Sequence, residues 1–152
     1  FVDLDFMFTL FLMIIDETDN LEYFLYKYNI SKKDQKRAYA ISNFYNEKNG
    51  SKTLNEVNLN KVLYYDGKQA VLDIINFKII KTKKLDKKLL SLLELYKNKI
   101  TPSLPVGANL LISRYKIPEG RQLGSMLKLI EEEWIRNNFK ISDKQIDSII
   151  KG

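Results

Sequence analysis

The stretch LPVGANLLISRYKIPEGRQLGSMLKLIEEEWIRNNF, residues 104–139, carries the most informative pattern of this chain. It predicts a short helix over about 108–115, after which Pro118-Glu119-Gly120 turns the chain. A long helix is expected over about 122–138, because apolar residues recur on one face: Leu123, Met126, Leu127, Ile130 and Trp134. This spacing predicts that Trp134 belongs to the core and is not a platform for base stacking.

Helical patterns also fill the rest of the chain. A first helix is expected over about 2–15, and it is apolar on most sides, as a central or interface helix would be. The helix that starts near Ser31 is expected to run to about Lys48, where Asn49-Gly50 stops it. Residues that cap helix N-termini precede several apolar stretches: Thr18 or Asp19, Ser31, Thr53 or Asn55, and Ser142.

No stretch alternates persistently enough to require a sheet, so the sequence predicts an all-α fold of about eight or nine helices. The loop with Pro102, Pro105 and Gly107 is the only plausible boundary between subdomains. We therefore expect a helical body over residues 1–100 and a C-terminal helical tail module over residues 101–152.

The composition excludes several kinds of chemistry. The chain contains no cysteine, which excludes disulfides, thiol nucleophiles and cysteine-bound zinc within it. It contains no histidine, which excludes histidine acid–base catalysis, serine triads and histidine metal sites. No P-loop or GxGxxG pattern is present either.

The net charge of +6 is unevenly distributed. Residues 1–30 have a net charge of −5, whereas residues 31–100 hold 16 basic and 7 acidic residues, a net of +9. Lysines gather near 32–37 and again near 81–88. A basic middle next to an acidic start indicates a polyanionic partner, although a lysine-rich solvated surface is the competing interpretation.

The apolar start FVDLDFMFTLFLMIID is too short for a membrane-spanning helix, which needs roughly 20 apolar residues. It also lacks the basic region and cleavage site of a signal peptide. We expect a buried helix here, no membrane association and a cytoplasmic location.

Close acidic residues occur at Asp3/Asp5, Asp16/Glu17 and Glu131–Glu133. Nucleotidyl transfer uses such carboxylates to hold divalent metal ions. Asp3 and Asp5 precede an apolar helix without a glycine-rich loop, so a helix-start role explains them better. The carboxylates of Glu131–Glu133 would fan around a helix axis. The sequence therefore predicts neither a catalytic residue nor a metal site in this chain.

Glycines and cations gather around the Pro118-Glu119-Gly120 turn. Helix N-termini that follow glycine turns expose N–H groups suited to phosphate. Nearby lie the basic residues Arg114, Lys116 and Arg121. These residues contact phosphate in one interpretation; in the other, the glycines only join three helices in a compact tail.

Several of these motifs resemble one family. Residues 104–139 resemble the C-terminal "PLP…G.DL…G..PGP..G..L..LE..W" segment of the bacterial tRNA nucleotidyltransferase (CCA-adding) and poly(A) polymerase family. Leu63–Leu72, LYYDGKQAVL, resembles its "LYR.G..A..d" motif, and Leu21–Lys36 resembles its entry to the helical body, with Ser31 in the serine position. The resemblance covers most of the chain, although Asn109 stands where the family has Asp.

The resemblance implies that this chain is the body-and-tail part of such a protein. The family's catalytic carboxylates have no counterpart here, so Mg²⁺ and CTP or ATP would belong to a head domain upstream or in trans. The isolated chain would be inactive and would need no cofactor of its own. Whether that protein adds CCA or poly(A) stays open.

The resulting hypothesis is a non-catalytic, RNA-binding protein that positions tRNA for 3′-end nucleotide addition. The candidate RNA-binding residues are Lys32, Lys33, Lys36, Arg37, Arg114, Lys116 and Arg121. Two alternatives stay open. One is a helical protein-interaction module that docks a partner through its apolar first helix, and the other is a degraded fragment of a split gene.

Overall fold

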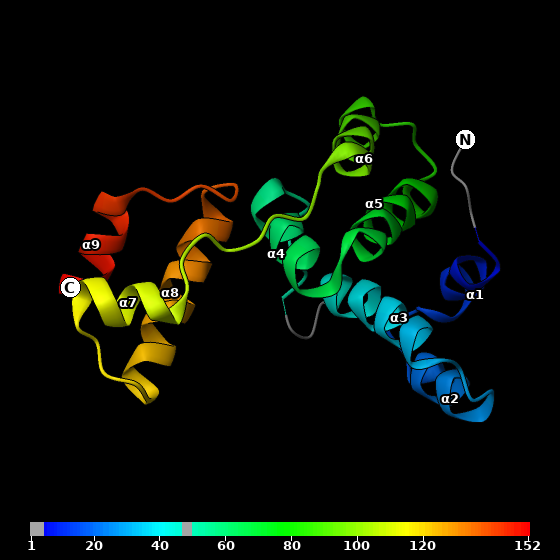
Figure 1. Cartoon of the computed structure of the whole chain (residues 1–152). Coiled ribbons are helices and arrows are strands. Elements are labelled where there is room, and N and C mark those ends of the chain that lie inside the picture. Colours follow the sequence, from blue (N-terminus) through cyan, green and yellow to red (C-terminus); the bar gives the residue numbers. More distant parts are fainter. Residues whose placement is uncertain (1–4, 47–49) are drawn as a thin grey trace. The chain divides into compact units, whose positions relative to one another are not determined.

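The structure is a computed structural model, which describes residues 5–46 and 50–152. In these ranges the chain forms nine α-helices and no strand, which confirms the all-α prediction. The chain divides into two compact units, Phe1–Thr101 and Pro102–Gly152 (Figure 1). The first unit contains α1 (Phe6–Ile14), α2 (Asn20–Lys27), α3 (Lys32–Tyr45), α4 (Glu56–Asp66), α5 (Lys68–Thr82) and α6 (Lys87–Asn98). The second contains α7 (Ala108–Tyr115), α8 (Arg121–Arg136) and α9 (Asp143–Lys151).

Side-chain caps fix where several helices begin. The side chains of Ser31 and Asn55 accept hydrogen bonds from the backbone N–H groups of Asp34 and Asn58. Ser142 forms a capping box with Gln145. Each cap satisfies an N–H group that the helix itself leaves without a partner. Ser31, Asn55 and Ser142 are therefore confirmed as N-caps, while Asp19 starts α2 without a side-chain cap bond.

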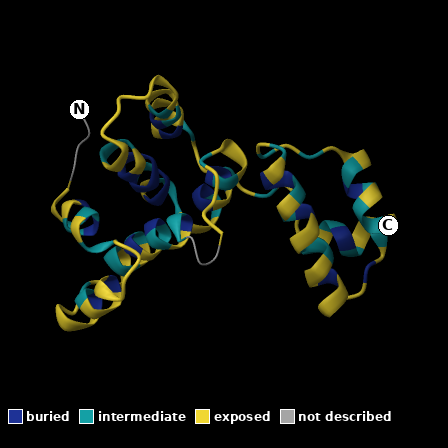
Figure 2. Cartoon of the chain, turned by 180° about the vertical axis from the view of Figure 1, so that it is seen from behind, coloured by how far each residue is buried: buried dark blue, intermediate teal, exposed yellow. Residues whose placement is uncertain are grey.

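Helix α5 is the central helix of the first unit. It packs against α3, α4 and α6, and buried residues lie on all of its sides (Figure 2). Gly67 joins it directly to α4 with a φ of 93°, a conformation that side-chain-bearing residues rarely adopt. Of the two places that the sequence left open for the first helix, central or at an interface, the central one belongs to α5.

Helix α1 is instead half-buried. It begins at Phe6, after the N-cap Asp5, and the expected start near residue 2 falls on residues 1–4, which lie outside the described part of the chain. Only Phe8 and Phe11 are buried, whereas Phe6 is 75% exposed and Met13 is 73% exposed. Helix α3 ends at Tyr45, and the expected end at Lys48 with the stop at Asn49 falls on residues that are not described.

A buried ionic cluster connects three helices of the first unit. Asp73 of α5 is 2% exposed, and its carboxylate accepts hydrogen bonds from Arg37 Nε at 2.8 Å and Nη2 at 3.1 Å. The same Nη2 donates to the helix cap Asp5 at 2.7 Å. Partial burial raises the pKa of Asp5, but the bonds from Arg37 and the Phe8 N–H outweigh it and leave the pKa below its usual value.

A second polar contact joins α4 to α6 and to the residue that follows it. Asn60 is 1% exposed, and its side-chain oxygen accepts hydrogen bonds from the Tyr96 hydroxyl at 2.8 Å and from Lys99 Nζ at 2.9 Å. Because buried polar groups need partners, this contact ties α6 to α4, while both helices pack against α5.

The second unit has its own apolar core between α7, α8 and α9. Its buried members are Val106, Leu111, Ile117, Leu123, Ile130 and Ile146. Trp134 is 2% exposed, and its ring meets Phe139 edge-on at a centroid distance of 5.0 Å. The prediction that Trp134 is a core residue is confirmed.

Across the described ranges, none of the helices has the length and apolarity that crossing a membrane requires.

Candidate nucleic-acid interface

Two of the predicted RNA-binding lysines line one hollow in the first unit. The hollow has a volume of about 430 Å³ and lies between α3, Lys52 and α4. Its lining residues are Lys32, Gln35, Lys36, Tyr39, Ala40, Asn43, Phe44, Lys52, Val62 and Asp66. We call it the α3 groove.

Helical spacing explains how α3 forms one wall of this groove. Lys32, Lys36, Tyr39 and Asn43 are separated by four, three and four residues, so they lie along one face of the helix. Ala40 lies on the same side and contributes only a methyl group. The sequence thus places two cations, an aromatic ring and an amide in a line beside open space.

Lysines come from both sides of the α3 groove. Lys52 precedes α4, and its backbone N–H donates to the Phe44 carbonyl at 3.0 Å, which holds this segment against α3. The Lys32 and Lys52 ammonium groups make no ion pair with any residue that the structure describes. Lys36 donates to the Tyr65 carbonyl at 3.2 Å and lies 4.0 Å from Asp66, while its side chain stays 60% exposed. Three lysines against one carboxylate give the groove a positive charge.

The two other candidates on α3 lie elsewhere. Lys33 is exposed but does not line the α3 groove. Arg37 turns inward, its side chain is only 11% exposed, and it pairs with Asp5, Asp34 and Asp73. Because three carboxylates of this chain already surround its guanidinium, Arg37 is a structural residue, and we omit it from the RNA interface.

The candidates of the second unit surround the connection between α7 and α8. Arg114 lies in the last turn of α7, Lys116 follows with a φ of 57°, and Arg121 is the first residue of α8. All three are exposed, and Arg114 lies 3.4 Å from Asp143. The α8 N-cap Gly120 provides no side-chain bond, so no side-chain cap satisfies the first N–H groups of this helix.

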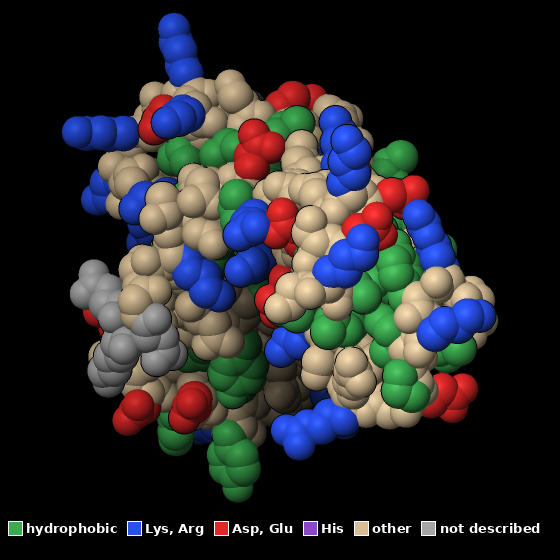
Figure 3. Space-filling view, turned by 90° about the vertical axis from the view of Figure 1, so that its left-hand side faces the viewer, with side chains coloured by type: hydrophobic (Ala, Val, Ile, Leu, Met, Phe, Trp, Pro, Cys, Tyr) green, Lys and Arg blue, Asp and Glu red, His purple; other side chains and the backbone are tan. Residues whose placement is uncertain are grey.

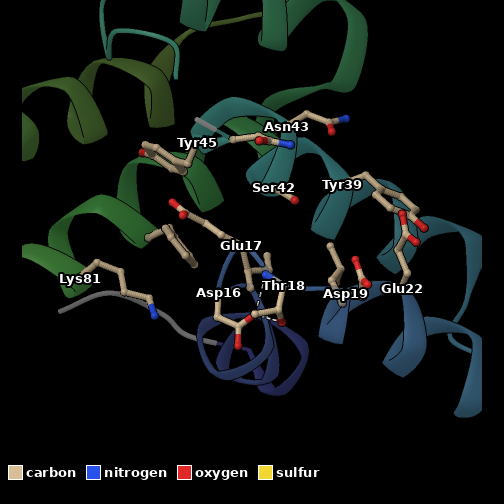
Figure 4. Close-up of a pocket in the computed structure, with 14 residues that line it drawn as sticks. Asp16, Glu17, Thr18, Asp19, Glu22, Tyr39, Ser42, Asn43, Tyr45 and Lys81 are labelled. Carbon is tan, nitrogen blue, oxygen red and sulfur yellow. Dashed lines mark hydrogen bonds between the residues drawn. The ribbon is translucent and has the colours of Figure 1, made fainter. Parts of the chain in front are cut away.

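A second hollow of about 480 Å³ has the opposite character (Figure 4). Of the described residues that line it, Asp16, Glu17 and Asp19 lie between α1 and α2, Glu22 lies on α2, and Lys81 of α5 is the single cation. Hydrogen bonds from Thr18 and Asn20 to Asp16 hold the pKa of this carboxyl below its usual value. Tyr39 and Asn43 line both hollows, so they form the wall that separates the acidic hollow from the α3 groove.

The acidic residues that lie close together in the sequence have structural roles, as far as the structure describes them. Asp5 caps α1, Asp16 closes a turn before α2, and Glu131–Glu133 lie within α8. Asp3 lies outside the described residues. Among residues 5–46 and 50–152, no three acidic side chains gather in a way that could hold a metal ion.

The surface charge is mixed on the one face that Figure 3 shows. Lysine and arginine side chains are scattered there, with acidic side chains between them.

Tyr39, Asn43 and Lys52 line the groove as well, and none of them was among the residues predicted from the sequence. Tyr39 follows Lys36 by one helical turn, so the lysine–lysine–tyrosine–asparagine spacing was a usable signal. Lys52 carried no such signal, because only folding places it opposite α3.

Comparisons with family models, with curated proteins and with solved structures found no match to this chain.

Proposed function

We propose that this chain is a non-catalytic RNA-binding protein whose α3 groove contacts the phosphate backbone. The observation that carries the proposal is the convergence of Lys32, Lys36 and Lys52 on one hollow beside Tyr39. Lysine ammonium groups neutralise phosphates, and an adjacent aromatic ring is typical of proteins that bind RNA. The acidic hollow on the other side of Tyr39 disfavours phosphate there, which directs the polyanion to the groove.

The more specific proposal is that the RNA is tRNA. The chain would be the body-and-tail part of a tRNA nucleotidyltransferase or poly(A) polymerase-like protein and would hold tRNA in the cytoplasm while a head domain extends the 3′ end. The motif resemblance within Leu63–Leu72 and residues 104–139 supports this assignment. Mg²⁺ and CTP or ATP would bind the head.

The first prediction concerns the groove lysines. The triple variant Lys32→Gln/Lys36→Gln/Lys52→Gln should bind tRNA more weakly than the wild type and with a smaller salt dependence. Each lost phosphate contact reduces the slope of log affinity against log salt by roughly 0.7–0.9. Filter binding over a range of salt concentrations measures this slope.

A matched control removes three positive charges elsewhere in the first unit. Lys61, Lys78 and Lys97 are exposed and do not line the α3 groove. The triple glutamine variant at these positions should keep the wild-type slope. An equal loss in both variants would show that net charge, and not the groove, binds RNA. Absence of RNA binding at low salt would overturn the proposed function.

The second prediction concerns catalysis. Purified residues 1–152 with Mg²⁺, CTP and ATP should add no labelled CMP or AMP to tRNA, because this sequence provides none of the family's catalytic carboxylates. A head-containing member of the family serves as the positive control. Incorporation at enzyme-like rates would contradict the assignment of this chain as a body-and-tail part.

The exposed side chains of α1 favour a second candidate function. Phe6 and Met13 are 75% and 73% exposed, and Leu10 between them is partly buried. Residues spaced in this way along a helix are typical anchors for a hydrophobic groove of another protein. A protein-interaction module would use this face, and it predicts no salt-dependent RNA affinity.

A further inference from the structure

We infer that the α3 groove takes a short unpaired stretch of RNA, with a base against the Tyr39 ring and phosphates at the lysines on either side. This inference rests on the proposed function and narrows it, because it names the form of RNA that the groove binds. It follows from the order of the side chains along the groove and from the open space beside them.

The Tyr39 ring is accessible. Tyr39 is 38% exposed, and it lines the groove as well as the acidic hollow. Within the described ranges its hydroxyl makes no hydrogen bond, so no polar contact ties the ring in place. A base can stack on an exposed aromatic ring whatever its identity, because every base has a π-face.

The space beside the ring is large enough for a nucleotide. The volume of about 430 Å³ lies within the roughly 300–1,000 Å³ of small-molecule sites. Ala40 keeps this space open, because its methyl group does not reach across the groove. Phe44 is 1% exposed and is fixed in the core below it.

Charges flank the ring on both sides. Lys32 and Lys36 precede Tyr39 on α3 by seven and three residues, whereas Lys52 lies near Phe44, at the other end of the helix. A strand that follows the groove would therefore meet ammonium groups before and after Tyr39. Asn43, one turn beyond Tyr39, offers an amide that can donate to and accept from the edge of a base.

This order of groups favours unpaired RNA over a duplex. In a double helix the bases are stacked on one another, and a protein reaches mainly phosphates and 2′-hydroxyls. Lysines on a flat surface would contact these groups of a duplex without an aromatic ring beside them. An aromatic ring between lysines contributes only when a base leaves its stack, which costs little in a loop or a single-stranded end.

The test compares two labelled RNAs, a short oligouridylate and a blunt-ended duplex of two annealed strands of the same length, by fluorescence anisotropy with the full chain. We expect the wild type to bind the oligouridylate more tightly. Tyr39→Ala should weaken that binding by roughly 5- to 150-fold, the usual effect of losing one stacked base, and leave duplex affinity unchanged. Tyr39→Phe keeps the ring and should keep the affinity.

Tyr26→Ala is the matched control, because Tyr26 is 88% exposed on α2 and lies outside the groove. It should bind both RNAs as the wild type does. Circular dichroism of each variant checks that the fold is kept, and Tyr39→Gln, which retains a polar side chain of substantial length, provides a second ring-less variant.

The outcomes separate this inference from the proposed function. If the wild type binds both RNAs equally and Tyr39→Ala changes neither affinity, the inference is wrong while RNA binding stands. An equal loss for both RNAs also overturns it, since the ring would then not distinguish unpaired bases. If neither RNA binds, the proposed function itself fails.

Discussion

Arg37→Met is expected to lower the free energy of unfolding by about 3–5 kcal/mol, as the loss of one partner from a buried ion pair does. The carboxylate of Asp73 is 2% exposed and receives two hydrogen bonds from the guanidinium. The methionine keeps the apolar stem but leaves Asp73 with only the Gln69 amide, which donates at 3.0 Å. Urea denaturation followed by circular dichroism measures the change.

The double variant Arg37→Met/Asp73→Leu distinguishes the cost of an unpaired charge from the cost of lost packing. Replacing both partners by apolar residues removes the buried charge, so the double variant should be clearly more stable than Arg37→Met alone. Lys33→Met on the same helix is the exposed control and should change stability by less than about 0.5 kcal/mol. If Arg37→Met is as stable as Lys33→Met, Arg37 is not structural and returns to the list of candidate RNA contacts.

Local signals made the helices predictable. Ser31, Asn55 and Ser142 each cap a helix through a residue three positions away, and such a contact is visible in the sequence. The apolar face around Trp134 depends on spacing within a single helix. Each of these predictions needed only residues that are neighbours along the chain.

Non-local contacts explain where the structure departs from what the sequence suggested. Arg37 lies among lysines in the sequence, and its pairing with Asp73 joins residues 36 positions apart. Helix α5 contains Lys68, Lys78 and Lys81, and these charges made a central position hard to predict. The uncharged α1, in contrast, has the composition of a buried helix. Which neighbour covers the apolar face of a helix depends on the tertiary fold. Periodicity within one helix does not identify that neighbour.

The residues of the candidate site also divide into those that a local sequence pattern predicts and those that only folding brings together. Lys32 and Lys36 were proposed from their place at a helix start, and both line the α3 groove. Lys52 reaches the groove because its backbone binds the Phe44 carbonyl, a contact that no local pattern encodes. A sequence search for lysines one helical turn from an aromatic residue would have found Tyr39. It would not have found Lys52 on the opposite side of the groove.

Trp134→Ala is expected to cost about 3–5 kcal/mol, the usual effect of truncating a large aromatic residue in a core. Trp134 is 2% exposed, its ring meets Phe139 edge-on, and the Phe139 N–H donates to the Trp134 carbonyl at 2.8 Å. Phe139 has a φ of 62°, which is unusual for an aromatic residue, so the ring contact helps to hold the end of α8.

Trp134 is the chain's single tryptophan, so the variant must be followed by circular dichroism and not by tryptophan fluorescence. Leu129→Ala serves as the control on the same helix, because Leu129 is 49% exposed and should cost little. Trp134→Phe retains an aromatic ring beside Phe139 and should lie between the alanine variant and the wild type. An alanine variant that melts like the wild type but no longer binds RNA would reverse the assignment and make Trp134 part of the binding surface.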